Sequence, residues 1–150
     1  MKKIESDGQS ILIGSLAYAL YWVDETLQAS LEAAGWERMS RTRSMTMVNI
    51  AVGVNRPAAL ARSLGVSRQA MHQLLQGLKE DGLVEVIPDP KDRRAKVVRF
   101  AAGAEGILTD ALKIMKGIEK ELSARLGKAE FERFEKALNQ DWGPISVIDI

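Results

Sequence analysis

The first part of the chain places apolar residues at helical spacing. Residues 10–34 form the first expected helix, with Ser10 as its cap and Gly35 as its stop signal. The first half of this helix, from Ile11 to Val23, is apolar on nearly every side. Such a helix has to be buried on more than one side. Because one small domain offers little room for this, the pattern suggests a partner subunit.

Two shorter helices are expected next. The first covers residues 41–52, with Ser40 as its cap, and its inward side chains are expected to be Met47, Ile50 and Ala51. Gly53 breaks it. The second begins at Pro57, because proline fits the first turn of a helix, and runs to Leu64.

A pair of helices around a glycine occupies the stretch LARSLGVSRQAMHQLLQGL. Gly65 permits a left-handed turn, and Ser67 can cap the second helix by accepting a backbone N–H bond. One side of that helix is apolar, with Ala70, Met71, Leu74, Leu75 and Leu78. The opposite side carries Arg68, Gln69, His72, Gln73 and Gln76. This pattern predicts a helix-turn-helix, and Gln and Arg are side chains that bind base edges in the major groove.

The next segment predicts a β-hairpin. Gly82 ends the preceding helix, LVEVIP favours a strand, residues 89–92 form a turn, and AKVVRF forms the returning strand. A hairpin after a helix-turn-helix is a winged helix, here with the tip cations Lys91, Arg93 and Arg94. We expect Arg93 or Arg94 to enter a minor groove or to bind phosphate, with Asp92 pairing one of them. Taken alone, the segment is better explained as a solvated turn; the preceding helices change that interpretation.

The last third of the chain is expected to be helical. A helix over residues 104–126 carries a seam like that of a coiled coil, with Leu108, Ala111, Met115, Ile118 and Leu122. A final helix over residues 128–140 is expected to turn Phe131, Phe134 and Leu138 inward. The tail WGPISVIDI is apolar, so we expect it to dock on another surface.

Charge is uneven along the chain, although the net charge is only +1. No acidic residue lies between Glu37 and Glu80, and residues 56–100 hold nine Lys/Arg against five Asp/Glu. A basic middle between acidic ends is typical of a surface that meets phosphate; the plainer explanation is a solvated face that happens to be basic. Arg41, Arg43, Arg56 and Ser67 therefore join the exposed helix residues and the tip cations as candidate DNA contacts.

Composition excludes several kinds of site. The 150 residues suit one domain, and the absence of cysteine excludes disulfides, thiol chemistry and the common structural zinc sites. The single histidine, His72, excludes a His-rich metal cluster, and no cofactor is predicted. There is no nucleophile–base pair and no phosphate-binding glycine loop, so we do not expect an enzyme. The uncharged run 11–23 is too short to span a bilayer, which takes about 20 residues, so a cytoplasmic protein is expected.

The stretch from Leu60 to Phe100 resembles the MarR (multiple-antibiotic-resistance) family of winged-helix regulators. The resemblance is carried by LARSLGVSRQAM, GLKEDGLVEV and DPKDRRAKVV. It implies a mainly α fold with a small β-wing, in which residues 40–100 form the winged helix of a single domain, 1–150. It also implies dimerisation helices over residues 10–36 and 104–150, and a homodimer that binds a roughly palindromic operator in double-stranded DNA.

The chain departs from the family pattern at two places. Val86 and Ile87 stand on the first wing strand, where the family often has arginine. The segment FAAGAEG, residues 100–106, lacks the threonine that usually caps the long helix, and its two glycines suggest a hinge.

Many relatives release DNA when a small, often aromatic, molecule binds between the dimer helices and the reading head. Bulky residues near the expected cleft are Tyr18, Trp22, Trp36, Met39, Met45 and Met47, a kind of residue that more often belongs to a core. The main hypothesis is therefore a dimeric, sequence-specific DNA-binding regulator, with repression favoured over activation. The alternative is a winged-helix protein-interaction module, which would need neither the acid-free stretch nor the polar face of the reading helix.

Overall fold

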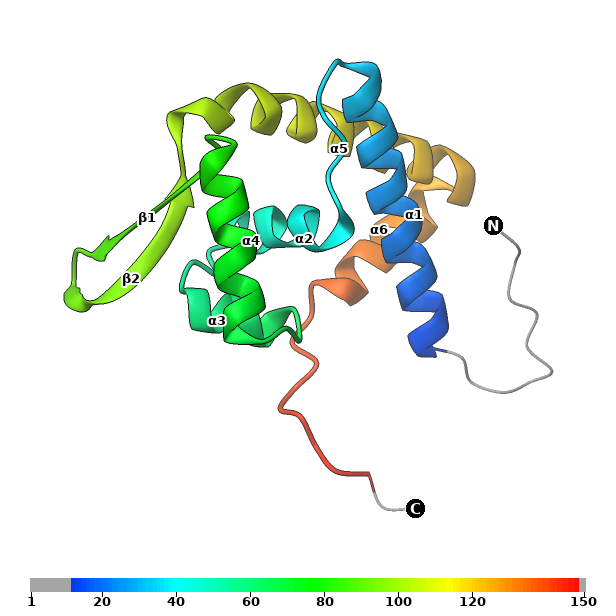
Figure 1. The fold of residues 1–150 in the computed structure, drawn as a ribbon. Coiled ribbons are helices and arrows are strands. Elements are labelled where there is room, and N and C mark those ends of the chain that lie inside the picture. The colour runs from blue at the N-terminus through cyan, green and yellow to red at the C-terminus, as the bar shows by residue number, and fades with distance from the viewer. Residues whose placement is uncertain (1–11, 149–150) are drawn as a thin grey trace. The chain divides into compact units, whose positions relative to one another are not determined.

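The computed structural model of the protein describes residues 12–148, and its elements are labelled in Figure 1. The helices that precede the hairpin are α1 (Leu12–Ala33), α2 (Arg41–Ala51), α3 (Pro57–Ser63) and α4 (Arg68–Glu80). The strands β1 (Val84–Asp89) and β2 (Asp92–Phe100) follow, and then the short 3-10 helix η1 (Ala102–Ala104), α5 (Glu105–Leu126) and α6 (Lys128–Leu138). The mainly α fold with a small β-wing is confirmed. The expected cap at Ser10 lies outside the described residues.

The chain divides within α5 into two compact units, Met1–Ile114 and Met115–Ile150. The first unit holds the winged helix together with α1 and the start of α5. The second holds the rest of α5 and α6. The expectation of a single domain over 1–150 stays a prediction.

The core of the first unit lies where α3, α4 and the hairpin meet. Leu60, Met71, Leu78, Val84 and Val98 each expose at most 1% of their surface there. Full burial of a large aliphatic side chain stabilises a fold by about 1.5–3 kcal/mol. Because α3 packs on α4 and α4 packs on β1, the helix-turn-helix and the hairpin share one core.

A buried polar network joins α1 to α2. Asp24 and Gln28 of α1 are each 2% exposed, and Ser44 of α2 is 4% exposed. The Ser44 hydroxyl donates to Asp24 Oδ1 at 2.7 Å, and Gln28 Nε2 donates to Ser44 Oγ at 3.3 Å. Gln28 Oε1 accepts the Met39 backbone N–H at 2.9 Å. These hydrogen bonds offset the cost of burying polar groups, so the network sets the position of α2 along α1.

The inward side of α2 is only partly as expected. Met47 and Ile50 are buried, whereas Ala51 is exposed. Ala51 is the last residue of α2, where the helix ends in solvent just before Gly53, so no neighbouring element covers it. The cap is confirmed, because the Ser40 side chain accepts the Arg43 backbone N–H.

The hairpin extends away from the helices as a two-stranded antiparallel ribbon (Figure 1). Val84 lies opposite Phe100, Val86 opposite Val98, and Pro88 opposite Lys96. Only Pro90 and Lys91 form the turn, so β1 lies one residue later than the predicted LVEVIP and β2 begins three residues before the predicted AKVVRF. A shift of register between Pro88 and Asp89 marks the approach to the tip.

Two glycines at the start of α5 allow close packing. A β-carbon on Gly103 would lie 2.7 Å from the carbonyl oxygen of Gly82, a distance that real structures do not tolerate. A β-carbon on Gly106 would lie 3.0 Å from the Trp36 ring. These contacts explain both glycines without the hinge that the sequence suggested.

Many large apolar side chains are not covered within the described chain. On α1, Leu12, Ile13 and Leu20 are exposed, with Ile13 at 85%. On α5, Leu112 and Leu126 are exposed. The expected burial of the first helix on more than one side is therefore absent within residues 12–148.

The second unit corrects the expected inward side of α6, and the docking of the tail on another surface stays a prediction. Ile118 and Phe131 are buried, but Phe134 and Leu138 are 41% and 44% exposed, because two short helical segments cover only one line of side chains. The apolar tail does not dock on the described chain. Its residues Trp142, Ile145, Val147 and Ile148 are each at least 65% exposed, although the Trp142 indole N–H donates to the carbonyl of Ala137.

We expect Gly103→Ala to lower the free energy of unfolding by about 1–3 kcal/mol, because the new methyl group overpacks the contact with Gly82. Gly117→Ala is the matched control. Gly117 lies inside α5 with nothing within 4 Å of a new β-carbon, and Ala is favoured over Gly in a helix by about 0.5–1 kcal/mol. Urea unfolding of both variants measures the difference. Equal stability of the two variants would contradict the close contact.

Candidate nucleic-acid interface

The helix-turn-helix is built by a tight turn between α3 and α4. Gly65 has a φ of +63°, which is the left-handed region that favours glycine. The Val66 N–H donates to the carbonyl of Ala61 at 3.0 Å and closes the turn. Ser67 then caps α4 by accepting the Ala70 N–H at 3.0 Å. The turn and cap predicted from the sequence are confirmed, and they aim one face of α4 outward.

That outward face is polar, as predicted. Its members Arg68, Gln69, His72, Gln73 and Gln76 are all exposed. Gln76 donates to Glu80 at 2.9 Å. Within residues 12–148 the other four make no side-chain hydrogen bond or ion pair. They are free to bind another molecule, although their contacts with DNA stay a prediction.

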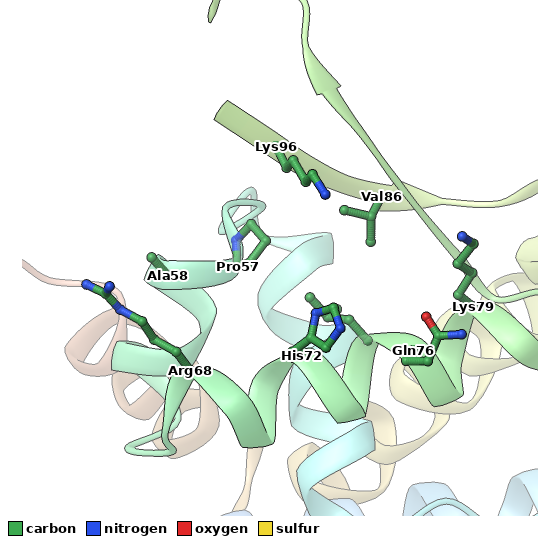
Figure 2. Close-up of a pocket in the computed structure, with 9 residues that line it drawn as sticks. Pro57, Ala58, Arg68, His72, Gln76, Lys79, Val86 and Lys96 are labelled. Carbon is green, nitrogen blue, oxygen red and sulfur yellow. The ribbon is translucent and has the colours of Figure 1, made fainter. Parts of the chain in front are cut away.

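A groove of about 590 Å³ separates this face of α4 from the wing. In Figure 2, Val86 and Lys96 reach down from the strands, while His72 and Gln76 rise from α4 below them. The groove is lined by Pro57, Ala58, Arg68, His72, Leu75, Gln76, Lys79, Val86 and Lys96. Three of these residues are cationic and none is acidic, so the groove favours an anion.

Two groove cations, Lys79 and Lys96, were missed by the sequence analysis. Lys79 follows His72 by seven residues, which is two helical turns, so helical spacing alone could have identified it. Lys96 lies opposite Pro88 in the hairpin. Its place in the groove depends on that register and on the packing of the hairpin against α4, which only the fold supplies.

The tip of the wing presents Lys91, Arg93 and Arg94, all exposed and without an ion pair in the part of the chain that the structure describes. Asp92 does not pair with either arginine side chain, contrary to the sequence-based expectation. Its carboxylate accepts the backbone N–H of Arg94 at 3.1 Å. Asp92 therefore stiffens the tip through the main chain and leaves the arginine charges available.

Residues 41–95, which hold α2 through most of the hairpin, match the model of the MarR family. The match covers the winged helix, 55 of the 150 residues. A search of curated proteins by sequence found no match.

Crystal structures of similar fold cover most of this chain. A transcriptional regulator named PA4135 matches with a TM-score of 0.69 and 19% identity, over 87% of this chain and 95% of that one. Wild-type MarR from E. coli, in its apo form, matches with a TM-score of 0.63 and 22% identity, over 87% and 96%. A mutant of MarR from E. coli complexed with operator DNA matches with a TM-score of 0.59 and 21% identity, over 87% and 95%. At these identities the likeness establishes the fold.

Three arginines predicted to meet DNA are engaged by partners within this chain. Arg41 Nε donates to Asp24 Oδ2 at 3.1 Å, Arg41 Nη2 pairs with Glu25, and its guanidinium lies 4.1 Å from the centre of the Tyr21 ring. Arg43 pairs with Asp81. Arg56 pairs with Asp89. Their acidic partners are distant in sequence, so the basic middle of the chain carries fewer free charges than its composition suggested.

The residues predicted to form an effector cleft are not all brought together. Trp36 and Met39 line a pocket of about 310 Å³ with Glu37, Arg43, Asp81, Leu83, Gly103 and Ile107. Trp22 lines a different and more open depression on α1. Met47 is buried in the core, Met45 is half-buried on α2, and Tyr18 is half-buried on α1 and lines neither pocket.

Residues 12–148 contain no group of three or more side chains placed to hold a metal ion. None of the helices in the same range has both the length and the hydropathy needed to cross a bilayer.

Trp36 also affects an ionisable group on α5. Its indole N–H donates to Asp110 Oδ2 at 3.0 Å, and Lys113 Nζ lies 3.3 Å from Asp110 Oδ1. The hydrogen bond from Trp36 and, after it, that from Lys113 lower the pKa of Asp110 below its ordinary value. A lowered pKa stabilises the fold at pH values where the carboxylate is ionised in the unfolded chain, and this stabilisation disappears as the pH falls through the folded-state pKa.

We expect Trp36→Phe to raise the pKa of Asp110 toward its ordinary value, because phenylalanine lacks the N–H donor. The stability difference between wild type and variant should shrink as the pH falls through the folded-state pKa of Asp110. An NMR titration of the Asp110 carboxyl measures the pKa directly. Lys113→Met is the control, and its effect on that pKa should be smaller. A larger effect of Lys113→Met would show that the indole is not the main cause.

Proposed function

We propose that the protein is a sequence-specific DNA-binding transcriptional regulator that acts as a homodimer on a pseudo-palindromic operator. The observation that carries the proposal is which charged side chains around α4 and the wing have partners within the chain. Every acidic residue from 80 to 92 is engaged by a partner in the chain: Glu80, Asp81, Glu85, Asp89 and Asp92. Within the described residues, cations of the same surface have no acidic partner: Arg68, Lys79, Lys91, Arg93, Arg94 and Lys96. This surface can therefore neutralise phosphates without first giving up internal ion pairs.

The two parts of the surface suit different tasks. The exposed amides of Gln69 and Gln73 can each make paired hydrogen bonds to an adenine edge in the major groove. The cations of the groove and of the wing tip suit the phosphates on either side, or a narrow minor groove. A reading helix flanked by a cationic wing suits sequence-specific binding, and the E. coli MarR mutant of similar fold is complexed with operator DNA.

A dimer would account for the exposed apolar residues of α1, α5, α6 and the tail. One helix-turn-helix makes few base contacts, and two heads about 34 Å apart can read two half-sites on one face of DNA. An obligate interface of this kind buries more than about 2,000 Å². Such a protein would act in the cytoplasm as a repressor by occupying its operator.

The pocket beside Trp36 supports release by a small aromatic effector. Trp36, Met39 and Ile107 offer apolar walls. Arg43 lines the same pocket, and its Nε is buried without a hydrogen-bond partner among the described residues. Arg43 also pairs with Asp81 at the end of α4. An effector with a hydrogen-bond acceptor would compete with Asp81 for the Arg43 side chain, which holds the end of α4.

We expect Gln69→Ala and Arg94→Ala to weaken operator binding in different ways. Gln69→Ala should remove preference at one base position, at a cost of about 1–3 kcal/mol. Arg94→Ala should weaken binding to every sequence and reduce the salt dependence by about one phosphate contact. Selection of bound sequences from a random pool identifies the site, and fluorescence anisotropy across salt concentrations measures both effects.

Lys120→Ala is the control, because it removes one exposed charge from α5, outside the winged helix. It should leave site preference and salt dependence unchanged. If wild type shows no salt-dependent retention of DNA, the proposed function is wrong. If both variants keep full affinity and preference, α4 and the wing are not the DNA-binding surface.

Sedimentation of the intact chain at micromolar concentration should give twice the 16.5 kDa of one chain. Deletion of residues 1–23, or truncation after Leu126, should give an aggregating or monomeric protein without operator binding. Ile13→Glu is a gentler test, because Ile13 is 85% exposed in the single chain and its replacement should dissociate the dimer without unfolding the winged helix. A well-behaved monomer of the intact chain would favour the protein-interaction alternative.

A further inference from the structure

An ion pair connects the helix-turn-helix to the tip of the wing. Asp89 is the last residue of β1 and is only 6% exposed. Its Oδ2 accepts a hydrogen bond from Arg56 Nη2 at 2.5 Å, and its Oδ1 accepts the backbone N–H of Lys91 at 2.9 Å. One carboxylate therefore holds the turn of the hairpin and, at the same time, a side chain from outside the hairpin.

Backbone hydrogen bonds fix Arg56, which is the other end of this connection. Arg56 is the N-cap residue of α3, and its carbonyl accepts the N–H groups of Ala59 and Leu60 at 2.9 Å each. The preceding carbonyl, that of Asn55, accepts the Val98 N–H of β2 at 2.7 Å. Residues 55 and 56 thus bind both strands of the wing while they begin the first helix of the helix-turn-helix.

The ion pair also controls the charge of the wing tip. Asp89 is a nearly buried carboxylate in the turn that carries Lys91, Arg93 and Arg94, and a buried charge requires a partner. Arg56 supplies that partner from α3. Without Arg56, Asp89 would draw on the nearest free cations, which are those of the tip itself.

We propose that Arg56 is a positioning residue, which holds the wing tip at a set distance from the reading helix through Asp89 and does not contact DNA itself. The proposal rests on the DNA-binding function proposed above and replaces the direct DNA contact that the sequence suggested for Arg56. Its consequence is that the cations of the tip act on DNA only while the Arg56–Asp89 pair is formed.

The variant Asp89→Asn distinguishes a positioning role of the Arg56–Asp89 pair from a purely electrostatic effect, because the two predict opposite changes in DNA affinity. The variant removes a negative charge from a DNA-binding surface, so electrostatics alone predicts tighter binding, the more so if Arg56 is released to bind phosphate. Positioning predicts weaker binding, by about tenfold in Kd, which corresponds to about 1.4 kcal/mol. Asparagine keeps an acceptor for the Lys91 N–H, so the turn itself is retained. Unchanged or tighter binding of Asp89→Asn overturns the proposal.

A double-mutant cycle provides an independent measurement. Arg56→Ala should weaken DNA binding in the wild-type chain but have no further effect in a Lys91→Ala/Arg93→Ala/Arg94→Ala background, because the tip then has no cations to position. Additive losses would show that Arg56 contacts DNA directly and would overturn the proposal. Arg56→Lys keeps the charge and should recover part of the affinity that Arg56→Ala loses.

Amide hydrogen exchange in the absence of DNA separates this inference from the proposed function. Arg56→Ala should accelerate exchange at Lys91 and Arg94, whose N–H groups are held at the tip, and leave exchange in the centre of α4 unchanged. If this occurs and wild type does not bind DNA, the proposed function fails while the positioning role stands. If wild type binds DNA and tip exchange is unaltered by Arg56→Ala, the positioning role fails.

Discussion

The packing of α3 against α4 is the constraint on which the rest of the structure depends. Leu60 and Leu78 are fully buried and Met71 is nearly so, and this contact requires the left-handed turn at Gly65. Once the apolar side of α4 is committed to α3 and β1, its polar side has only solvent to face. Val84 and Val98 of the wing are buried in the same core, so this core also positions the wing. The surface proposed to bind DNA is thus a product of burial on its opposite side.

Charge in this protein serves two separate purposes. Arg41, Arg43 and Arg56 hold elements together, each through a carboxylate on another segment. The cations of the groove and the tip are held by no such partner within residues 12–148 and can serve a ligand. Because the internal pairs consume most acidic groups near the wing, the remaining surface is more uniformly positive than the net charge of +1 indicates. Where the charges are paired therefore matters more than how many there are.

Local patterns predicted the elements well, and distant contacts account for what they missed. The cap at Ser67, the turn at Gly65 and the exposed face of α4 follow from short-range rules, and the structure has all three. The partner of Arg56 lies 33 residues away and that of Arg43 lies 38 residues away, and no periodicity encodes such pairs. The exposed Phe134 and the undocked tail show the same limit, because apolar composition indicates burial without naming the surface that provides it.

The network of Asp24, Gln28 and Ser44 determines how motion can pass between α1 and α2. Apolar side chains at a helix contact can slide past one another with gradual loss of packing, whereas hydrogen bonds between buried polar groups are either made or broken. A slide of one helical turn would leave a carboxylate, an amide and a hydroxyl without partners in a dry interior. The buried hydrogen bonds therefore favour one position of α2 along α1, and leaving it would cost the free energy of every bond in the network.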